Sequence, residues 1–338
     1  MPELRQDLVT RNWVAVATER AKRPNDFAST VRRTLAPSDD CPFCPGNEHL
    51  TPPEVLALPG DGRDGDGHWS VRVVPNKYPA FCQDHEGCYG SSRPSLVRVG
   101  PYASMAATGT HEVFITPHHD RGYGGLSLDE AYALLSAYRD RYLEHAANES
   151  HKYILIMTNY GREAGASVDH PHSQLLGIPV VPALVSTELM GAADHLRRTQ
   201  RCVFCEMVEH ELAEETRIVA ETRNFTVFCP YASRSPFETW IVPKGHSAYF
   251  ERLKDAELRE LSEVLVDFLS RLSEGLGDPA YNFYLHTSPV NDGVRAFYHW
   301  HIEILPRLAV PAGFELGTGV MINVTKPEDA AAFLRDVP

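Results

Sequence analysis

Apolar residues follow two different periods along the chain, and the two periods alternate. Over 127–146 and 253–276 apolar residues recur at three- and four-residue steps, which predicts two amphipathic helices. Short runs rich in Val, Ile, Tyr and Phe lie on both sides of each helix and are typical of strands. These runs are 71–81, 111–117 and 152–160 in the first half, and 224–231, 237–245 and 281–289 in the second.

The two halves of the chain repeat one series of features. Each half begins with a Cys-x-x-Cys pair and continues with two strands, a histidine, a helix, a strand and a His-x-His motif. Six features in the same order indicate a duplication. We therefore predict an α+β fold of two similar domains, each an antiparallel half-barrel sheet with packed helices. The predicted domains are 1–190 and 191–338, with the join inside 182–201.

Composition narrows the classes of function. The chain has 338 residues, of which 45 are acidic and 32 are Lys or Arg, giving a net charge of −13. This balance argues against broad nucleic-acid binding, which needs a positive surface, although a local group of arginines can hold one nucleotide. There is no run of about 18 apolar residues, so no membrane span is expected. The charged N-terminal sequence lacks a signal-peptide core, and we expect a cytoplasmic protein.

Four of the seven cysteines form the Cys-x-x-Cys pairs. This spacing occurs in redox motifs and in zinc knuckles, and the 16 histidines favour zinc, because thiolate and imidazole are its usual donors. A Cys pair with two distant histidines makes a closed, structural Cys2His2 set, and the repeat supports one set in each half. The predicted ligands are Cys41, Cys44, His119 and His170, and Cys202, Cys205, His246 and His299.

Two alternatives stay open for these sets. A degenerate knuckle without metal is one alternative for each Cys pair, and His118 competes with His119 as a ligand. The three cysteines outside the pairs are expected to be ordinary thiols, because a free Cys mostly behaves as a small hydrophobe. For His49, His85 and His111 a surface position is the default interpretation.

The sequence HPHSQ, which starts at His170, carries the candidate chemistry. Positions i and i+2 of an extended chain point to one face, so metal can hold His170 while His172 stays free. A neutral imidazole is nucleophilic toward phosphorus and can form a covalent phosphoramidate. Gln174 lies on the same face, and its amide can donate to a phosphoryl oxygen. The preceding loop supplies Gly165 and Ser167, whose N–H and hydroxyl groups can approach a phosphate.

The string GASVDHPHSQ resembles the active-site signature of the galactose-1-phosphate uridylyltransferases, a family of the histidine-triad superfamily. Four further segments support the resemblance, which covers residues 8–335. They are TERAKRP, CPFCPGN, VPNKYPAF and YHWHIEILPR. The resemblance implies two tandem histidine-triad-like domains, a homodimer in which a C-terminal segment reaches toward the partner's site, and contacts with nucleotide or phosphate. The residues it implies for these contacts are Arg20, Arg23, Asn76 and Asn159.

The reaction implied by the resemblance is a ping-pong nucleotidyl transfer. His172 attacks the α-phosphorus of a UDP-sugar and releases the sugar 1-phosphate, and a hexose 1-phosphate then takes the UMP group from the covalent nucleotidyl-histidine. Gln174 and Ser167 bind the phosphoryl group during the transfer. A solvated basic patch is the alternative interpretation of Arg20 and Arg23.

The second half leaves the second metal open between zinc and iron. One type of family member holds iron with a Glu and three His, and here Cys202 and Cys205 favour zinc instead. The positions that match the iron ligands are Glu188, His286, His299 and His301. Glu303 can be a ligand or a salt-bridge partner.

The C-terminal segment departs from the resemblance. Thr318 and Gly319 stand where the family has a Tyr-Glu pair that contacts the hexose. The same segment resembles the ADP-glucose phosphorylases, which transfer an adenylyl group to phosphate, and this is the alternative function. Two other classes also remain: a nucleotide hydrolase of the histidine-triad type, and a non-catalytic module that binds zinc or senses nucleotides.

Overall fold

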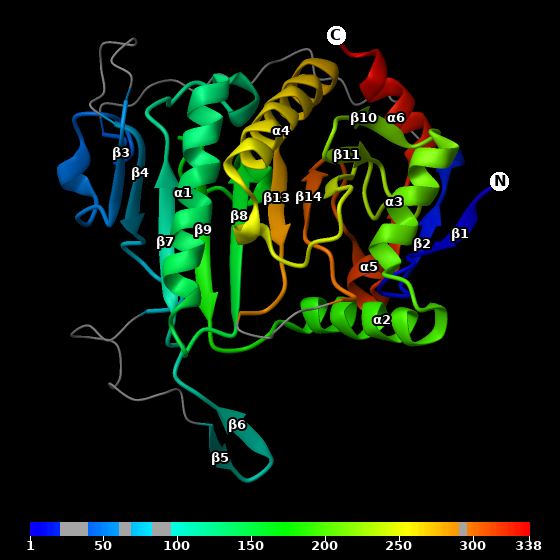
Figure 1. Ribbon diagram of the computed structural model, residues 1–338, viewed down its shortest axis with the longest axis horizontal. Coiled ribbons are helices and arrows are strands. Elements are labelled where there is room, and N and C mark those ends of the chain that lie inside the picture. Colours follow the sequence, from blue (N-terminus) through cyan, green and yellow to red (C-terminus); the bar gives the residue numbers. More distant parts are fainter. Residues whose placement is uncertain (21–39, 61–68, 83–95, 291–295) are drawn as a thin grey trace.

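One antiparallel sheet of ten strands runs through both halves of the described chain (Figure 1). The structure is a computed structural model that describes residues 1–20, 40–60, 69–82, 96–290 and 296–338. In order across the sheet the strands are β10 (Ile218–Glu221), β11 (Phe225–Phe228), β12 (Thr239–Pro243), β14 (His301–Pro306), β13 (Tyr281–His286), β8 (Tyr153–Tyr160), β9 (His172–Ile178), β7 (Thr110–Ile115), β4 (Trp69–Pro75) and β3 (Leu56–Pro59).

Each half of the chain contributes five adjacent strands to this sheet, in matching order. The first half gives β3-β4-β7-β9-β8, and the second gives β10-β11-β12-β14-β13. In both halves the strand at the His-x-His motif lies between the strand before the helix and the strand after it. The halves meet where β8 pairs with β13, with Asn159 opposite Asn282. The predicted α+β duplication is therefore confirmed.

Two long helices lie side by side on one face of the sheet, α1 (Leu128–Ala146) and α4 (Asp255–Leu276) (Figure 1). Ser127 begins α1 with a capping box, because its hydroxyl accepts from the backbone of Glu130 and the Glu130 carboxylate accepts from the backbone of Ser127. The apolar faces predicted from periodicity are buried against the sheet in one core. They include Leu134, Leu135, Tyr138 and Tyr142 of α1, and Leu258, Leu261, Leu265 and Leu272 of α4.

The other elements surround the second half of the sheet or extend from the first. α2 (Ala183–Thr199) spans the stretch in which the sequence places the join, and the boundary at residue 190 stays a prediction. The remaining helices and strands are α3 (Val203–Glu214), α5 (Gly313–Thr318), α6 (Pro327–Asp336), β1 (Glu3–Gln6), β2 (Trp13–Val16), β15 (Met321–Asn323), β5 (Val97–Val99) and β6 (Tyr102–Ser104). Short 3-10 turns occur at Thr18–Arg20, Glu48–Leu50, Tyr123–Gly125, Arg162–Ala164 and Phe250–Arg252.

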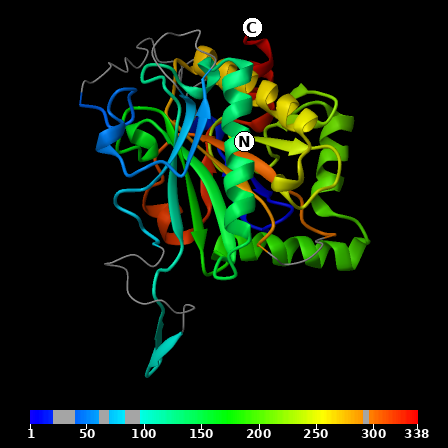
Figure 2. The same cartoon turned by 60° about the vertical axis from the view of Figure 1, so that its left-hand side comes forward.

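The elements outside the sheet differ between the two halves. On the second half, Val9 from the β1–β2 turn packs with Phe204 of α3 and Trp240 of β12 in one apolar cluster. On the first half, the hairpin β5–β6 extends away from the rest of the molecule (Figure 1 and Figure 2). Within the described ranges, no helix combines the length and apolar character that crossing a membrane requires.

Candidate active site

His172 is the first residue of β9, and its ring is held in one orientation. Its Nδ1 lies 2.8 Å from the backbone oxygen of His170, so Nδ1 carries the hydrogen and donates it. The lone pair is then on Nε2, the nitrogen that remains for attack on phosphorus. The side chain is 5% exposed. Burial lowers the pKa of His172, which keeps the ring neutral at neutral pH.

Ser173 fixes which face of β9 carries the candidate chemistry. Its Oγ lies 2.7 Å from both the Tyr123 hydroxyl and Thr158 Oγ1, and it also contacts the Tyr138 hydroxyl. These groups are buried under the helices, so the Ser173 side chain points to the helix-covered face. Because side chains alternate along a strand, His172 and Gln174 point to the opposite face. A register shift of one residue would turn the His172 ring into the core.

The structure brings together the four predicted ligands of the first half, Cys41, Cys44, His119 and His170. Cys44 Sγ lies 3.2 Å from His119 Nδ1 and 3.7 Å from His170 Nδ1. A tetrahedral zinc with ordinary bond lengths gives S···N separations of about 3.6 Å, so the set fits this metal. His170 Nε2 donates to the Thr116 oxygen at 2.7 Å, which leaves Nδ1 facing the thiols.

The surroundings of the histidines near Cys41 and Cys44 show which of them are placed to bind metal. Burial lowers the pKa of His170 to about 4, so this ring is neutral, as a metal ligand must be. The His118 ring instead contacts the Glu130 carboxylate and the Arg121 guanidinium. His119 is therefore the histidine that the fold places beside the Cys pair.

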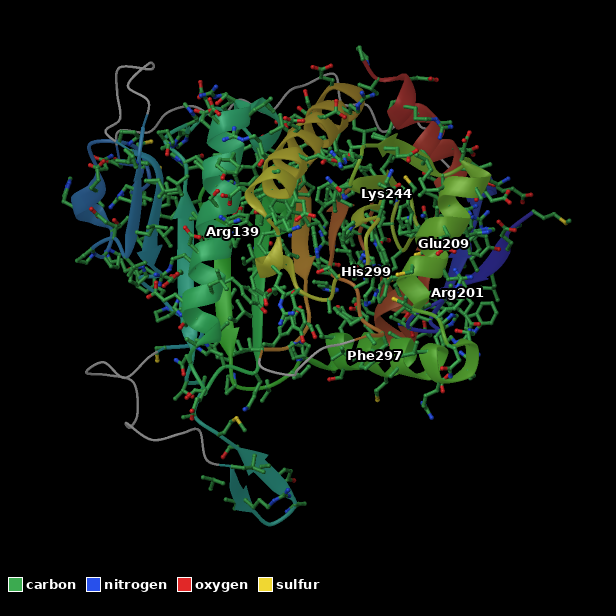
Figure 3. All side chains as sticks on the ribbon, viewed as in Figure 1. Arg139, Arg201, Glu209, Lys244, Phe297 and His299 are labelled. Atoms are coloured by element: carbon green, nitrogen blue, oxygen red, sulfur yellow. The ribbon has the colours of Figure 1, made fainter. Side chains whose placement is uncertain are left out.

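The second half has a matching group, Cys202, Cys205, His246 and His299. Cys205 Sγ lies 3.3 Å from His246 Nδ1 and 3.6 Å from His299 Nδ1. Cys202 Sγ lies 3.5 Å from the backbone oxygen of Phe297, and Figure 3 shows Phe297 next to α2 and His299 farther up, toward α3. The hydrogen bond from Cys205 lowers the pKa of Cys202, and His246 and His299 add to the effect.

A third group of possible metal ligands lies in the second half, and it contains three of the four residues that match the iron ligands. Glu188, His286 and His301 offer buried ligand atoms within 4.8 Å of one another, whereas His299 lies with the cysteines. His286 Nδ1 lies 3.1 Å from Glu188 Oε2. Glu303, which the sequence leaves open, forms an ion pair with Arg234 and lies 3.4 Å from His301 Nε2.

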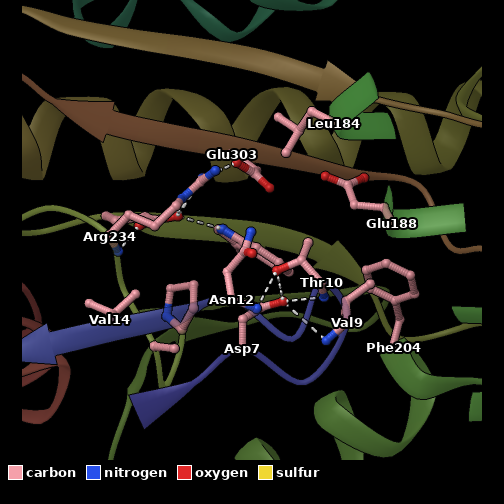
Figure 4. A pocket seen from close by; sticks show the side chains of 14 residues that line it. Asp7, Val9, Thr10, Asn12, Val14, Leu184, Glu188, Phe204, Arg234 and Glu303 are labelled. Atoms are coloured by element: carbon pink, nitrogen blue, oxygen red, sulfur yellow. Dashed lines mark hydrogen bonds and ion pairs between the residues drawn. The ribbon is translucent and has the colours of Figure 1, made fainter. Parts of the chain in front are cut away.

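These acidic groups face a pocket in the second half (Figure 4). Glu188, Glu303 and Arg234 line it, together with Asn12 from the N-terminal segment and Leu184 of α2. Figure 4 shows the Arg234 guanidinium paired with the Glu303 carboxylate. The pocket belongs to the face that carries His301, the counterpart of His172, and it presents carboxylates where β9 presents Gln174.

The loop before the HPHSQ motif is held by the second half of the chain. Asn282 Nδ2 donates to Asn159 Oδ1 at 2.6 Å and to the Ala164 oxygen at 2.9 Å. Arg307 donates in turn to Asn282 Oδ1. The sequence does not point to Asn282, because its contacts depend on the pairing of β13 with β8, which no motif in the sequence marks.

The structure places the remaining predicted residues as follows. Gly165 has φ +90°, a left-handed conformation that a larger residue would adopt only with strain, and Ser167 is exposed in the same loop. Arg20 ends the turn Thr18–Arg20, and Arg23 lies outside the described residues.

Asn76, Gln174 and His111 meet at the edge of the first site. His111 Nε2 lies 2.7 Å from Gln174 Oε1, and Asn76 Nδ2 lies 3.1 Å from the same nitrogen. His111 is therefore not a surface histidine, as expected by default, but a half-buried part of the site.

The cysteines outside the pairs differ from one another. Cys229 is a free, buried thiol, as expected. Cys82 is disulfide-bonded, so the expectation of an ordinary thiol is wrong for this residue.

Comparison with known families decides the membership of the chain. The family model described as galactose-1-phosphate uridyl transferase, N-terminal domain, matches residues 1–182. The chain belongs to this family. A second model, described as a domain of unknown function, matches residues 108–335.

Named relatives of two activities match nearly the whole chain. An ADP-glucose phosphorylase from Arabidopsis thaliana is 37% identical over 99% of this chain and 93% of its own length. A galactose-1-phosphate uridylyltransferase from Thermotoga maritima is 28% identical over 99% and 98%. The predicted family and the predicted enzyme class, a nucleotidyltransferase, are confirmed.

Solved structures match the whole fold. An ADP-glucose phosphorylase from Arabidopsis thaliana with bound ADP-glucose has a TM-score of 0.82 at 35% identity, with all of both chains covered. A uridylyltransferase has a TM-score of 0.76 at 29% identity, covering 100% of this chain and 98% of its own. The predicted α+β architecture, with an antiparallel half-sheet and packed helices from each half of the chain, is confirmed.

Proposed function

We propose that this chain transfers a nucleotidyl group from a nucleoside diphosphate sugar through a covalent adduct on His172. The observation that carries the proposal is the orientation of this ring. Nδ1 donates to the His170 oxygen at 2.8 Å, and Nε2 keeps its lone pair on the face that carries Gln174. A ring held in this way attacks phosphorus without a base, because the attacking nitrogen has no hydrogen to lose.

In the first half-reaction, His172 Nε2 forms a bond to the α-phosphorus. The bond from phosphorus to the bridging oxygen breaks, and its electron pair leaves with the sugar 1-phosphate. The ring becomes cationic, and the Nδ1–H bond to the His170 carbonyl stabilises that charge. In the second half-reaction, an acceptor oxygen attacks the same phosphorus, and the pair of the N–P bond returns to Nε2.

Gln174 and the loop before the motif bind the transferred group. The Gln174 amide donates to a non-bridging oxygen, where charge grows in the transition state. Gly165 and Ser167 offer a backbone N–H and a hydroxyl from the loop, while Asn76 and Asn159 contact the nucleotide or its phosphates. Arg20 and Arg23 complete the proposed phosphate contacts from the N-terminal segment.

Adenylyl transfer from an ADP-sugar to phosphate is the first activity that we propose. It is supported by the ADP-glucose phosphorylase relative, at 37% identity against 28% for the Thermotoga enzyme. The segment with Thr318 and Gly319, which lacks the Tyr-Glu pair, supports the same choice. Transfer of UMP from a UDP-sugar to a hexose 1-phosphate is the second candidate, supported by the uridylyltransferase relatives.

We also propose zinc at both Cys-His sets, with iron as the alternative in the second half. The sulfur–nitrogen separations of 3.2–3.7 Å and the closed donor sets support structural zinc. Bound zinc would fix His170, whose carbonyl holds His172. It would supply rigidity to the site.

A homodimer is a further part of this proposal, with 310–325 reaching toward the partner's site. Large exposed apolar side chains on α5 and on the hairpin β5–β6 support it, because such patches mark interaction surfaces. They include Phe314, Leu316, Val99 and Tyr102. Light scattering tests this, and a mass of 37.7 kDa in solution would contradict it. The cytoplasmic location stays a prediction.

A donor and acceptor panel tests the activity. The chain is incubated with ADP-glucose, UDP-glucose or UDP-galactose labelled at the α-phosphorus, and then with phosphate or a hexose 1-phosphate. We expect label on the protein that an acceptor discharges, and none on His172→Gly. Label released into water as the mononucleotide would indicate a hydrolase, and the absence of label with every donor would indicate a non-catalytic module.

A further inference from the structure

His111 shares the face of the sheet that carries the nucleophile. It lies on β7, which pairs with β9 so that Val113 is opposite Gln174 and His111 is opposite Leu176. Residues directly opposite in a pair point to one face, and so do residues two apart along a strand. The His111 ring therefore lies on the face of the sheet opposite the helices, within reach of Gln174.

The hydrogen bonds of His111 determine its tautomer. The backbone N–H of Ala80 donates to Nδ1 at 3.1 Å, so Nδ1 carries no hydrogen. In the neutral ring the hydrogen is then on Nε2, which lies 2.7 Å from Gln174 Oε1. Gln174 accepts this hydrogen through its oxygen. Burial lowers the pKa of His111, which favours the neutral ring that this arrangement needs.

A terminal amide has two ends of nearly equal shape but opposite polarity. If the Gln174 amide were turned by 180°, its NH2 group would face the Nε2–H of His111, donor against donor. Its oxygen would then face the phosphoryl oxygens, acceptor against acceptor. We propose that His111 is a positioning residue that makes Gln174 present its NH2 group to the transferred phosphoryl group. This inference rests on the proposed function, in which Gln174 donates to that group.

The backbone of His111 holds the segment that carries a second predicted substrate contact. The backbone N–H of Asn76 donates to the His111 carbonyl at 2.8 Å, and Asn76 Oδ1 accepts from the backbone of Tyr78 at 2.9 Å. The Asn76 amide nitrogen lies 3.1 Å from His111 Nε2, and because Nε2 carries a hydrogen this contact is not a hydrogen bond. His111 thus joins the segment 76–80 to β9.

A double-mutant cycle separates positioning from general support of the fold. His111→Phe keeps a ring of similar size but neither accepts from Ala80 nor donates to Gln174. His111→Gln keeps an acceptor and a donor. Each is made with Gln174 and with Gln174→Ala, and the rate of label transfer from ADP-glucose to His172 is measured in a single turnover. His210→Phe, an exposed histidine of α3, is the matched control.

We expect His111→Phe to slow label transfer by about 10- to 100-fold when Gln174 is present, because a misdirected donor loses transition-state contact. With Gln174→Ala the same change should alter the rate by less than about twofold, since the group that it orients is gone. His111→Gln should recover most of the rate. His210→Phe should match the unaltered chain.

Three results would overturn the inference. One is an equal slowing by His111→Phe in both backgrounds, which would indicate a purely structural role. Another is a normal rate for His111→Phe with Gln174 present. Absence of label on the unaltered chain with every donor would overturn the proposed function as well, and this result is distinct from the first two.

Discussion

The strands at the two His-x-His motifs occupy matching places in the two halves, yet the side chain two residues after the second histidine differs between them. On β9 this residue is Gln174, whose amide can donate a hydrogen bond. On β14 it is Glu303, whose carboxylate only accepts. Opposite Glu303 lies Trp240, which stacks on His301 with the ring centroids 4.6 Å apart. Opposite Gln174 lies the smaller Val113.

The charged groups around the two motifs also differ. Burial lowers the pKa of His172, and it also acts to lower that of His286, but Glu188 and Glu303 outweigh it and raise the pKa of His286. The positive Arg234 in the pocket of the second half is already paired with Glu238 and Glu303. A phosphate there would meet the carboxylates of Glu188, Glu238 and Glu303. The comparison teaches that a duplicated frame changes its chemistry through a few side chains on one face.

The largest expected effect is loss of the nucleophile. His172→Gly should lower the rate of nucleotidyl transfer by at least about 10⁴-fold, because the nitrogen that forms the proposed adduct is removed. The matching change in the second half, His301→Gly, should still allow label to reach His172. Label transfer per folded protein, with folding checked by circular dichroism, measures both. Turnover by the His172→Gly variant would contradict the assignment.

Exchanging the residues that differ sharpens the comparison. Gln174→Glu gives the first site the carboxylate of the second, and it should slow label transfer by about 10²–10³-fold, because a donor is replaced by a negative charge. Glu303→Gln should leave the transfer rate unchanged and lower the free energy of unfolding by about 1–3 kcal/mol, since Arg234 loses one buried partner. Transfer kinetics and urea unfolding measure the two effects. A normal rate for Gln174→Glu would show that its donor is not used.

The two Cys-His sets should differ in their link to activity. Cys41→Ser should lower the transfer rate by about 10- to 100-fold, because His170 lies in this set and its carbonyl orients His172. Cys205→Ser should lower the melting temperature but not the rate per folded molecule. Zinc content by mass spectrometry accompanies the kinetics. Equal loss of rate in both variants would contradict the structural separation of the two sets.

The smallest effect concerns the contact between the halves. Asn282→Ala removes the bonds to Asn159 and to the Ala164 carbonyl, and it should slow transfer by less than about 10-fold through a looser loop. Asn282→Asp, which keeps an acceptor for Arg307 but loses the donor, should behave in the same way. Single-turnover kinetics checks this. If only the alanine variant is slow, the Arg307 contact matters and the loop contacts do not.

The sequence predicts the frame of this molecule well because the frame depends on local signals. Periodicity places α1 and α4, and the repeated order of Cys, His and His-x-His motifs predicts which distant residues meet at each Cys pair. Contacts that depend on strand register escape it. His111 meets Gln174 only because β7 pairs with β9, and Asn282 meets Asn159 only because β8 pairs with β13.

Glu303 shows what the tertiary fold decides. The sequence leaves Glu303 open between metal ligand and salt-bridge partner, and its ion pair is with Arg234, a distant residue that no motif marks. This partner is brought to Glu303 by the tertiary fold, which spacing along the chain does not encode.

The pairing of β8 with β13 has a consequence for dissecting the protein. Cutting the chain between its halves would leave each fragment with a long, exposed strand whose backbone groups had lost their partners, a typical starting point for aggregation. The N-terminal fragment would keep every ligand of its own Cys-His set and still lack the asparagine that steadies its loop. We therefore expect the N-terminal fragment to transfer label more slowly than the undivided polypeptide, although the proposed nucleophile belongs to that half alone.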